Sequence, residues 1–480
     1  MAYEDLYAFV ESLERHGELK RIALEVDPDL EITEITDRVC KKDGPALLFE
    51  RVRGSDIPVL MNAFGSMRRM CLALQVDRLD EIGADVDELL AMKVPERWAE
   101  KLGTLPKLKR LLDMTPKTVT RAPCQEVVET ERPSLEGLPI LRCWPGDGGR
   151  FITLPVVVTK DPETGIRNAG MYRMHVFDDR TTGMHWHPHK GGAQHYRIAE
   201  HLGHRLEVAV ALGPDPAVTY AATAPVPDGM DEFAFAGFLR KARTELVKCV
   251  TVDLEIPANA QIVLEGYVEP GERRQEGPFG DHTGFYSPAD LYPVFRLTAV
   301  TRRERPIYPA TVVGKPPMED CFLGKATERI FLPALRRYLP EIVDMNLPVE
   351  GVFHNLAIVS IDKRYPGHAR KVMHALWGMG QMMLTKIIVV LDREVDVHNL
   401  REVLWRVGNA IDPQRDIEVT TGPADVLDHA AYLPGLGSKM GIDATRPWPD
   451  EGFDREWPDP IEMSPEVMRR VDEMWDRLGL

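Results

Sequence analysis

The sequence predicts a multidomain protein of mixed α+β and α/β class. At 480 residues the chain is too long for one ordinary hydrophobic core. Short β-branched runs separated by turns fill residues 151–315, which indicates a mostly antiparallel sheet or barrel. Helical and strand patterns alternate on both sides of this stretch and indicate flanking α/β domains. The predicted domains are therefore residues 1–115, 116–318 and 319–480.

The first domain is predicted from one amphipathic helix and several short strands. Apolar residues recur at helical spacing over residues 4–16. Prolines and glycines concentrate in residues 116–150, a composition that breaks helices and marks the first boundary. The predicted strands are residues 19–24, 46–49 and 59–62.

The central domain is predicted to be rich in strands, with one helix near residues 230–243. Its strands are expected at residues 154–159, 172–177, 206–212, 246–254, 262–268 and 295–300.

In the third domain, helices at residues 325–339 and 368–384 alternate with strands at 356–361 and 386–391. This alternation favours an α/β domain with a parallel sheet. A last helix is expected at residues 464–480, with Ser464 as N-cap and one apolar stripe. Such a stripe is typical of a helix that docks on another subunit, so we expect at least a dimer.

Composition excludes several classes of protein. Acidic residues outnumber basic ones by 75 to 59, giving a net charge of −16, which opposes binding to nucleic acid or anionic membranes. Six cysteines without a CxxC pair fit reduced thiols rather than a disulfide framework. The N-terminus has no signal-peptide pattern, and no apolar run is long enough to span a membrane. We therefore expect a cytoplasmic protein with no integral membrane segment and no nucleic-acid partner.

The first segment with chemical potential reads RNAGMYRMH, residues 167–175. In a strand, Arg173 and His175 would share one face. An arginine next to the Gly170 turn can offer both a guanidinium and backbone N–H groups to an anion. The alternative is an arginine on an exposed strand face.

The second segment, HWHPHKGG, places three histidines at alternate positions from His185 to His189. In a strand these side chains would point the same way and could gather a metal. Pro188 interrupts a regular strand, so a solvated strand with one structural histidine is the alternative.

Two further segments carry carboxylates. DEFAFAG, residues 231–237, begins the predicted helix, where acids commonly complement the helix dipole. EGPFGDHTG, residues 276–284, holds two acids in a loop made rigid by proline and glycine. Such a pair can differ in pKa enough to act as base and acid, although turn geometry alone also explains it. The segment PGLGSKMG, residues 434–441, meets neither nucleotide-binding spacing.

Taken together and in this order, NAGMYRM, HWHPHKGGA, DEFAFAGFLRKARTELVKC, EGPFGDHTGFY and GLGSKMGIDAT resemble the UbiD family of reversible decarboxylases. The resemblance runs over essentially the full length. It implies an N-terminal α/β domain, a central split β-barrel of flavin-reductase type and a C-terminal α/β oligomerisation domain. It also implies prenylated FMN, made by a separate flavin prenyltransferase, with Mn²⁺ or Mg²⁺ at its phosphate and K⁺ nearby. A homodimer or a dimer-based hexamer is expected.

The resemblance assigns site residues by motif. Asn168, His189 and Glu232 correspond to the metal ligands, and their oxygen and imidazole donors suit Mn²⁺ or Mg²⁺. The expected cofactor-binding residues are Met171, Tyr172, Arg173, His185, Trp186, His187, Lys190, Gly191 and, more weakly, Lys386.

Arg173, Glu276 and Asp281 correspond to the catalytic network. Arg173 would hold the substrate carboxylate, Asp281 would deliver a proton once CO2 has left, and Glu276 would tune both. The family reaction proceeds through a covalent adduct of the substrate with the cofactor, and it can run backward at high CO2.

The sequence departs from the family pattern at His185 and His187, where relatives often carry Arg and an apolar residue. Asp281 followed by His-Thr-Gly resembles members that act on aromatic quinone-precursor acids. This favours a hydroxybenzoate or hydroxynaphthoate type of substrate.

Three other functions remain open at this point. An FMN oxidoreductase on a split barrel would give Glu276 and Asp281 no clear role. A metal-dependent hydrolase would use the HWHPH histidines to activate water and would be indifferent to flavin. A non-enzymatic scaffold would leave the two-acid loop and the arginine strand unexplained.

Overall fold

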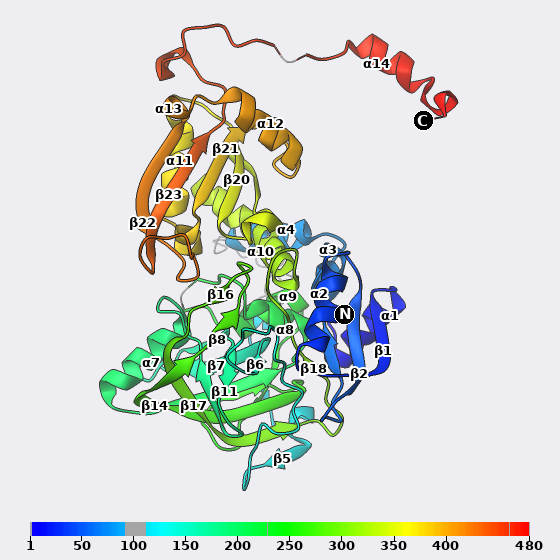
Figure 1. Ribbon diagram of the computed structural model, residues 1–480, viewed down its shortest axis with the longest axis vertical. Helices are drawn as coiled ribbons and strands as arrows, with labels where there is room; N and C mark the ends of the chain where they lie inside the picture. The colour runs from blue at the N-terminus through cyan, green and yellow to red at the C-terminus, as the bar shows by residue number, and fades with distance from the viewer. Residues whose placement is uncertain (1, 92–111, 228, 460, 480) are drawn as a thin grey trace, which may run out of the picture.

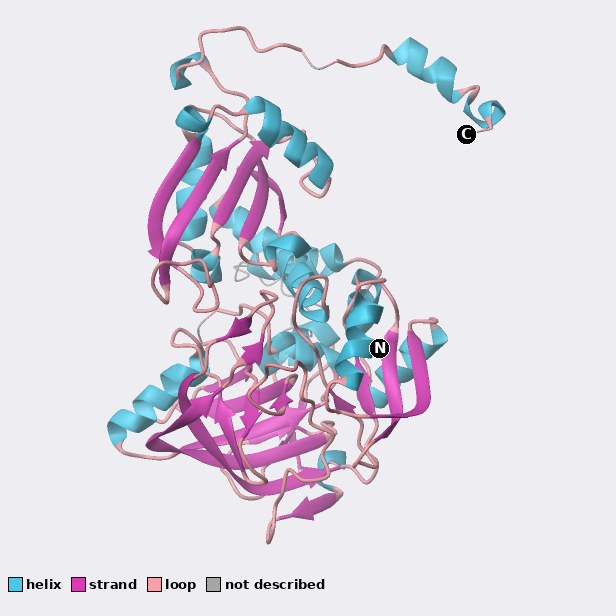
Figure 2. Cartoon of the chain, viewed as in Figure 1, coloured by secondary structure: helices cyan, strands magenta, loops and turns pink. Residues whose placement is uncertain are grey.

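The computed structural model describes residues 2–91, 112–227, 229–459 and 461–479, and Figure 1 traces them from blue to red. A small N-terminal sheet lies beside a larger central sheet, and helices separate the central sheet from a third sheet (Figure 2). This three-part α and β arrangement agrees with the predicted fold class.

The N-terminal sheet has the strand order β1-β2-β3-β18 among the described residues. Strand β18 belongs to the far end of the central segment, so the two parts of the chain interlock. Helix α1 is capped by Asp5, whose side chain accepts a hydrogen bond from the Ala8 N–H at 3.0 Å. The elements confirm the predicted helix and strands: α1 (Leu6–Arg15), β1 (Leu19–Val26), α2 (Glu31–Cys40), β2 (Ala46–Val52), β3 (Val59–Met61), α3 (Met67–Leu74), α4 (Leu79–Leu90) and β18 (Tyr308–Pro309).

In the described part of the chain, the central sheet follows the order β6-β9-β10-β17-β14-β11-β7-β8, with β5 paired to β17. Its pairings are antiparallel, as predicted. No pairing among the described residues closes the sheet, so the split barrel stays a prediction. The strands are β5 (Val127–Glu129), β6 (Phe151–Ile152), β7 (Pro155–Lys160), β8 (Arg167–Met171), β9 (Met174–Val176), β10 (Thr181–Met184), β11 (Leu206–Leu212), β14 (Ile262–Glu276) and β17 (Asp290–Arg302).

Helices and smaller sheets surround this sheet. The helix predicted near residues 230–243 is confirmed as α9. The additional elements are β4 (Lys117–Val119), η1 (Pro123–Gln125), α7 (Gly191–Leu202), α8 (Pro216–Ala221), α9 (Glu232–Arg240), β12 (Glu245–Lys248), β13 (Glu255–Pro257), β15 (Phe279–Gly280) and β16 (Tyr286–Ser287).

The prediction of one strand over residues 246–254 is wrong, because β12 ends at Lys248. The Glu265 carboxylate accepts hydrogen bonds from the backbone N–H groups of Val250 and Thr251, at 2.8 and 2.6 Å. These bonds draw the chain out of the strand ladder, a competition that the apolar pattern does not reveal.

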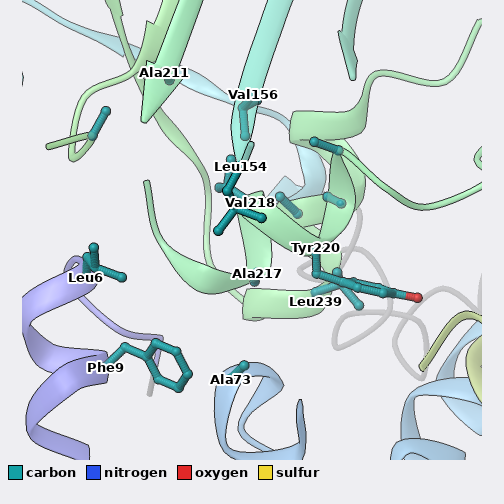
Figure 3. Packing of buried hydrophobic residues seen from close by; sticks show 14 of the residues in the cluster. Leu6, Phe9, Ala73, Leu154, Val156, Ala211, Ala217, Val218, Tyr220 and Leu239 are labelled. Carbon is teal, nitrogen blue, oxygen red and sulfur yellow. The ribbon is translucent and has the colours of Figure 1, made fainter. Parts of the chain in front are cut away.

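One hydrophobic core joins the N-terminal helices to the central sheet. Figure 3 shows Leu6 and Phe9 of α1 near α8, which carries Tyr220. Phe9 and Tyr220 are both 0% exposed, and Val156 of β7 belongs to the same cluster. Burial of such side chains supplies most of the favourable free energy of packing.

The C-terminal sheet has the order β19-β20-β21-β23-β22 within the described ranges. The inner strands β20, β21 and β23 are parallel, as predicted, whereas the edge strands β19 and β22 are antiparallel. Its elements are α10 (Glu319–Tyr338), β19 (Ile342–Asn346), η2 (Val349–Gly351), β20 (Leu356–Ile361), α11 (His368–Trp377), η3 (Gly380–Leu384), β21 (Ile387–Asp392), α12 (Leu400–Ala410), α13 (Pro413–Asp416), β22 (Ile417–Pro423), β23 (Leu436–Asp443) and η4 (Pro449–Glu451).

Two predicted helices are shorter than expected. The helix predicted over residues 368–384 ends at Trp377, because Gly378 caps it and Gly380 takes a left-handed φ of +48°. The last helix divides into α14 (Pro465–Asp472) and η5 (Trp475–Leu478). Ser464 is the N-cap of α14, as predicted.

The last segment of the chain extends away from the C-terminal sheet, and α14 stands apart from the remaining elements in Figure 1. In the described residues, no helix combines the length and apolar character needed to cross a membrane.

Candidate active site

Arg173 lies in an irregular link between β8 and β9. Strand β8 ends at Met171, which pairs with Val156 of β7. The next β7 residue is Pro155, which has no N–H for the ladder. The chain therefore leaves the ladder, and the prediction that Arg173 and His175 share one face of a regular strand is wrong.

The Arg173 guanidinium joins two acids. Its Nε donates to Glu276 Oε1 at 2.9 Å, and its Nη1 donates to Asp281 Oδ2. Nη2 donates to the Ser287 hydroxyl at 3.2 Å, and the guanidinium carbon lies 4.5 Å from the centroid of the Phe279 ring. The side chains of Arg173, Glu276 and Asp281 are 9%, 0% and 6% exposed. The predicted catalytic residues therefore form one buried cluster.

The two acids are held by the loop between β14 and β16. Glu276 is the last residue of β14, and Asp281 follows β15 directly. Gly277 takes a left-handed φ of +89°, which favours glycine there. The Gly280 N–H donates to Asp147 Oδ1 at 2.7 Å and ties the loop to the segment before β6. This fixed loop explains how acids five positions apart reach one guanidinium.

Both acids are held ionised. Burial raises the pKa of Glu276, but the His185 hydrogen bond and the Arg173 charge outweigh burial and lower that pKa to about 2. For Asp281, burial is again outweighed, here by Arg173 and His282, so its pKa lies well below the usual range. Burial lowers the pKa of Arg173, but the two carboxylates outweigh burial, so the pKa of Arg173 lies above its ordinary value.

The HWHPH segment is not a strand. Strand β10 ends at Met184, and turn bonds follow, from the Trp186 N–H to the Met184 carbonyl and from the Lys190 N–H to the His187 carbonyl. His185 Nδ1 lies 3.1 Å from Glu276 Oε2. Across the described residues, no three or more His, Cys, Asp or Glu side chains form a group that could hold a metal ion. The strand geometry that would have pointed all three histidines the same way is therefore absent from this segment.

His185 and His187 lie against each other, with their Nε2 atoms 3.0 Å apart. The His185 ring also stacks on Tyr292 at a centroid distance of 4.3 Å. Burial lowers the pKa of both histidines, and the pKa of His187 falls to about 3. Both rings are therefore neutral near pH 7.

The predicted cofactor-binding segments meet at the start of α7. The Tyr172 hydroxyl lies 3.4 Å from the backbone N of Gly192. A Cβ on Gly192 would come within 2.6 Å of Trp186 Nε1, so this close approach requires glycine. Trp186 Nε1 is buried and has no hydrogen-bond partner among the described residues. A buried donor of this kind fits a site that a polar ligand completes.

Lys190 is the N-cap residue of α7 and half-buried, while Met171 ends β8. Burial lowers the pKa of Lys190, and the charge of Asp425 acts in the opposite direction. A cation at a helix N-terminus offers both its own charge and the helix N–H groups to a phosphate. These residues fit the phosphate end of a flavin nucleotide.

The segments that carry the three predicted metal ligands contact one another. Glu232 begins α9, and its Oε2 accepts a hydrogen bond from the Ala169 N–H at 2.9 Å, next to Asn168. A Cβ on Gly191 would collide with Asn168 Oδ1, so the Asn168 amide lies against the start of α7. Gly191 is two residues after His189 in the sequence. Burial raises the pKa of Glu232 to about 7. Metal binding by Asn168, His189 and Glu232 stays a prediction.

Lys386 precedes β21 of the C-terminal sheet, and its Nζ donates to Asp428 Oδ1 at 2.6 Å. The predicted phosphate contact of Lys386 is not tested by this ion pair and stays a prediction.

Sequence reasoning missed three residues of the cluster. His282 Nδ1 lies 2.8 Å from Asp281 Oδ1, Ser287 accepts from Arg173, and Asp147 fixes Gly280. His282 stands inside the quoted motif directly after Asp281, a signal that could have suggested its contact. Asp147 is distant in sequence, so no local pattern could identify it.

Three family models match this chain. The N-terminal, Rift-related and C-terminal domains of 3-octaprenyl-4-hydroxybenzoate carboxy-lyase match residues 10–86, 117–316 and 321–444. The chain belongs to the UbiD family. It is accordingly a carboxy-lyase, as the sequence predicted.

Other proteins are similar to this chain over nearly its whole length. An uncharacterized protein of Archaeoglobus fulgidus is 59% identical over 480 residues, which covers 100% of this chain and 99% of the relative. The closed form of the Sedimentibacter hydroxybenzoicus vanillic acid decarboxylase is 31% identical, with a TM-score of 0.85 and 99% of each chain covered.

The UbiD-class enzyme HmfF of Pelotomaculum thermopropionicum, in complex with FMN, is 32% identical with a TM-score of 0.80, covering 97% of this chain and 98% of that one. An evolved dimeric form of HmfF, in complex with prFMN, gives 31% identity and a TM-score of 0.78 over the same shares.

Proposed function

We propose that this UbiD-family protein catalyses the reversible, non-oxidative decarboxylation of an aromatic or α,β-unsaturated carboxylic acid with prenylated FMN. The buried cluster in which Arg173 joins Glu276 and Asp281 carries this proposal. A guanidinium between two ionised acids can take up a carboxylate, and an acid beside it can supply the proton that replaces CO2. The family's FMN and prFMN complexes support the choice of cofactor.

Arg173 binds the substrate carboxylate by exchanging one of its present partners. Burial raises the pKa of Asp281, but the Arg173 charge and the contacts with His282 outweigh burial and lower that pKa. When a substrate carboxylate takes the Arg173 charge, burial is opposed less strongly and the pKa of Asp281 rises, so that Asp281 can hold a proton. Asp281 then donates this proton to the carbon from which CO2 has left. Glu276, fully buried, keeps Arg173 oriented throughout.

Prenylated FMN, when bound, supplies an electron sink for the electron pair that CO2 leaves behind. The residues that would hold it are those around the start of α7, including Tyr172, Trp186 and Lys190. Asn168, His189 and Glu232 would hold Mn²⁺ or Mg²⁺ at its phosphate, with K⁺ nearby. The partnerless Trp186 Nε1 and the glycines of this segment fit such a ligand. A split-barrel geometry of the central sheet and a covalent substrate adduct belong to the same proposal.

We propose a hydroxybenzoate or hydroxynaphthoate type of acid as the substrate, and the Asp-His-Thr-Gly pattern at residues 281–284 favours a quinone-precursor acid within this class. Similarity to a vanillic acid decarboxylase supports an aromatic acid. A homodimer or a dimer-based hexamer, a flavin prenyltransferase as supplier of cofactor, and a cytoplasmic location complete the proposal.

The test uses protein co-expressed with a flavin prenyltransferase. Mass spectrometry of the released small molecule is expected to give the mass of prenylated FMN. The loaded enzyme is then expected to release CO2 from at least one of vanillic, 4-hydroxybenzoic, 3,4-dihydroxybenzoic, 1,4-dihydroxy-2-naphthoic and cinnamic acids. Protein made without the prenyltransferase is the control.

Two results would contradict the proposal. Release of plain FMN from the co-expressed protein, with no decarboxylation, would favour an oxidoreductase. A protein that carries prenylated FMN but decarboxylates none of these acids would exclude the proposed substrate class.

A further inference from the structure

His282 makes two hydrogen bonds that lead away from the catalytic acid. Its Nδ1 lies 2.8 Å from Asp281 Oδ1, and its backbone N–H donates to the same oxygen at 2.7 Å. On the other side of the ring, Nε2 lies 2.8 Å from Nε2 of His354. His282 thus connects the active-site loop to the C-terminal part of the chain.

The hydrogen bonds restrict where the protons can be. The ionised Asp281 is an acceptor only, so His282 Nδ1 must donate to it. Of the two facing Nε2 atoms, one must donate and the other accept. The charge of Asp281 raises the pKa of His282, although burial acts against it, whereas burial lowers the pKa of His354. A neutral His282 would accept from His354 at Nε2, but the acids that face His282, Asp281 first among them, favour the arrangement in which His282 is the imidazolium and His354 the neutral acceptor.

Charged groups from several elements surround His282. Asp281 precedes it in its own loop, and Asp320 lies in the first turn of α10. Asp425, in the segment after β22, also acts on it, while Arg173 is bonded to Asp281. The acids outnumber the cations around this ring, which favours a charged His282.

The backbone before His354 adopts a rare conformation. Val352 and Phe353 have φ values of 46° and 54°, in the left-handed region that β-branched and bulky residues seldom adopt. Phe353 stacks on His282 at a centroid distance of 5.3 Å. A Cβ on Gly324 of α10 would lie 2.5 Å from Phe353 Cβ, so α10 packs closely against the Phe353 side chain. Local strain of this kind is characteristic of functional sites.

We propose that His282 is a proton reservoir that reloads Asp281, and that His354 of the C-terminal part is the positioning residue that holds it. This inference rests on the proposed function, in which Asp281 protonates the product. The stored proton lies one hydrogen bond from the acid, so reloading does not require water to enter the site.

Each turnover consumes one proton. When Asp281 gives its proton to the product carbon, a C–H bond forms and Asp281 becomes a carboxylate. The Nδ1–H of the His282 imidazolium then moves to Asp281, and His282 becomes neutral. His282 recovers a proton from bulk solvent when the product leaves and the next substrate binds.

The first experiment measures the protonation of His282 directly in the cofactor-loaded protein. The exchange rate of the histidine C2 hydrogen with deuterium, followed by peptide mass spectrometry across pH, gives the pKa of individual histidines. We expect His282 to titrate above pH 6.5, and Asp281→Asn to lower its pKa by at least about one unit. Titration of His282 at or below pH 6.5 would overturn the reservoir, whatever acid the enzyme decarboxylates.

The second experiment follows kinetics with the most active acid of the panel named above. In the wild-type enzyme, kcat is expected to fall as pH rises through the pKa of His282, because His282 then loses the proton that reloads Asp281. His282→Gln should lower kcat by about 100-fold with KM changed less than about twofold, and should abolish this limb of the pH profile. His354→Gln should retain the limb but move it to another pH.

The control is His204→Gln, since His204 is exposed in the turn after α7. Its kcat and pH profile should match those of the wild type. An unchanged alkaline limb in His282→Gln would overturn the proposal, even if the variant is slow, because a purely structural loss lowers kcat at every pH. A wild-type enzyme that decarboxylates none of the acids overturns the proposed function, and the role of His282 falls with it.

Discussion

At the scale of single residues, the central feature is an arginine shared by two ionised acids. Arg173 donates to Glu276 and Asp281, and the three side chains are almost fully buried. When one acid is replaced, the other still bonds Arg173. Each acid can therefore be tested separately.

We predict that Asp281→Asn retains prenylated FMN but loses about 10²–10⁴-fold in kcat, because an amide cannot donate the proton. Glu276→Gln should also retain cofactor and should raise KM as well as lower kcat, since Arg173 loses its fully buried anchor. Cofactor content by absorbance and steady-state kinetics check both predictions.

The matched control is Glu163→Gln, an acid in an exposed turn before β8. It should leave cofactor content and kinetics unchanged. Wild-type kcat in both Asp281→Asn and Glu276→Gln would contradict the assigned roles.

The same acids predict how stability depends on pH. The folded-state pKa of Glu276, about 2, lies below its ordinary value of 4.5, and the pKa of Asp281 is lowered in the same sense. Their contribution to the free energy of unfolding is therefore present above about pH 5 and is lost as pH falls toward 2. Each carboxyl contributes on the order of 1.4 kcal/mol for every pH unit by which folding lowers its pKa.

Melting temperature measured from pH 7 to pH 3 should fall in the wild type. The fall should be shallower in Asp281→Asn, which has one fewer depressed carboxylate, and unaltered in Glu163→Gln. Equal slopes in the three proteins would show that Asp281 is not held ionised by the fold.

At the scale of elements, α1 joins the N-terminal sheet to the central core. Phe9 is 0% exposed and stacks on Phe64 at a centroid distance of 5.8 Å. Phe9→Ala should lower the free energy of unfolding by about 3–5 kcal/mol through lost burial and a residual cavity. Chemical denaturation measures this loss, and kcat per folded molecule should be unchanged because α1 does not touch the acid cluster.

Leu24→Ala is the comparison, since Leu24 is 77% exposed on β1. Its effect should lie within about 0.5 kcal/mol. A similar loss for both variants would mean that α1 is not packed as the structure shows.

The sequence predicted regular elements well wherever apolar periodicity decides the conformation. Strand β11 coincides with the predicted residues 206–212, and α1 falls within residues 4–16. The failures occur where a distant polar group captures the backbone or a ladder ends. Glu265 ends the strand predicted over residues 246–254 after β12, and Pro155 ends the β8 ladder just before Arg173.

The candidate site was predictable only in part, for a related reason. Arg173, Glu276 and Asp281 stand in recognisable motifs, and the fold brings them together. His354 stands in no motif, and its contact with His282 bridges 72 positions of sequence. Contacts of this kind depend on how the C-terminal sheet is placed, which local periodicity does not encode.

At the scale of the whole molecule, the last segment is notable because it extends away from the three sheets (Figure 1). Helix α14 stands apart from the sheets in Figure 1, and several large apolar side chains near it are exposed. Their exposed fractions lie between 37% and 104%, and the residues are Ile461, Met463, Met468, Met474, Trp475 and Leu478. Exposed apolar surface of this kind favours contact with another subunit.

We predict that deleting residues 464–480 lowers the oligomeric state without unfolding the chain. The chain would lose this docking surface, whereas the hydrophobic cores of the N-terminal, central and C-terminal sheets lie outside the deleted segment. Light scattering coupled to size exclusion should show a smaller solution mass than that of the full-length protein, and circular dichroism should retain the helix and strand signal.

Point variants separate the apolar stripe from the charge of the segment. Val467→Asp combined with Val471→Asp places charges on the stripe, while Arg469→Asp introduces a negative charge on the opposite side of the same helix. The double variant should dissociate like the deletion, and Arg469→Asp should keep the full-length mass. An unchanged mass for both the deletion and the double variant would mean that subunits associate through another surface, because burying two new carboxylates in an apolar contact is too costly for that contact to survive.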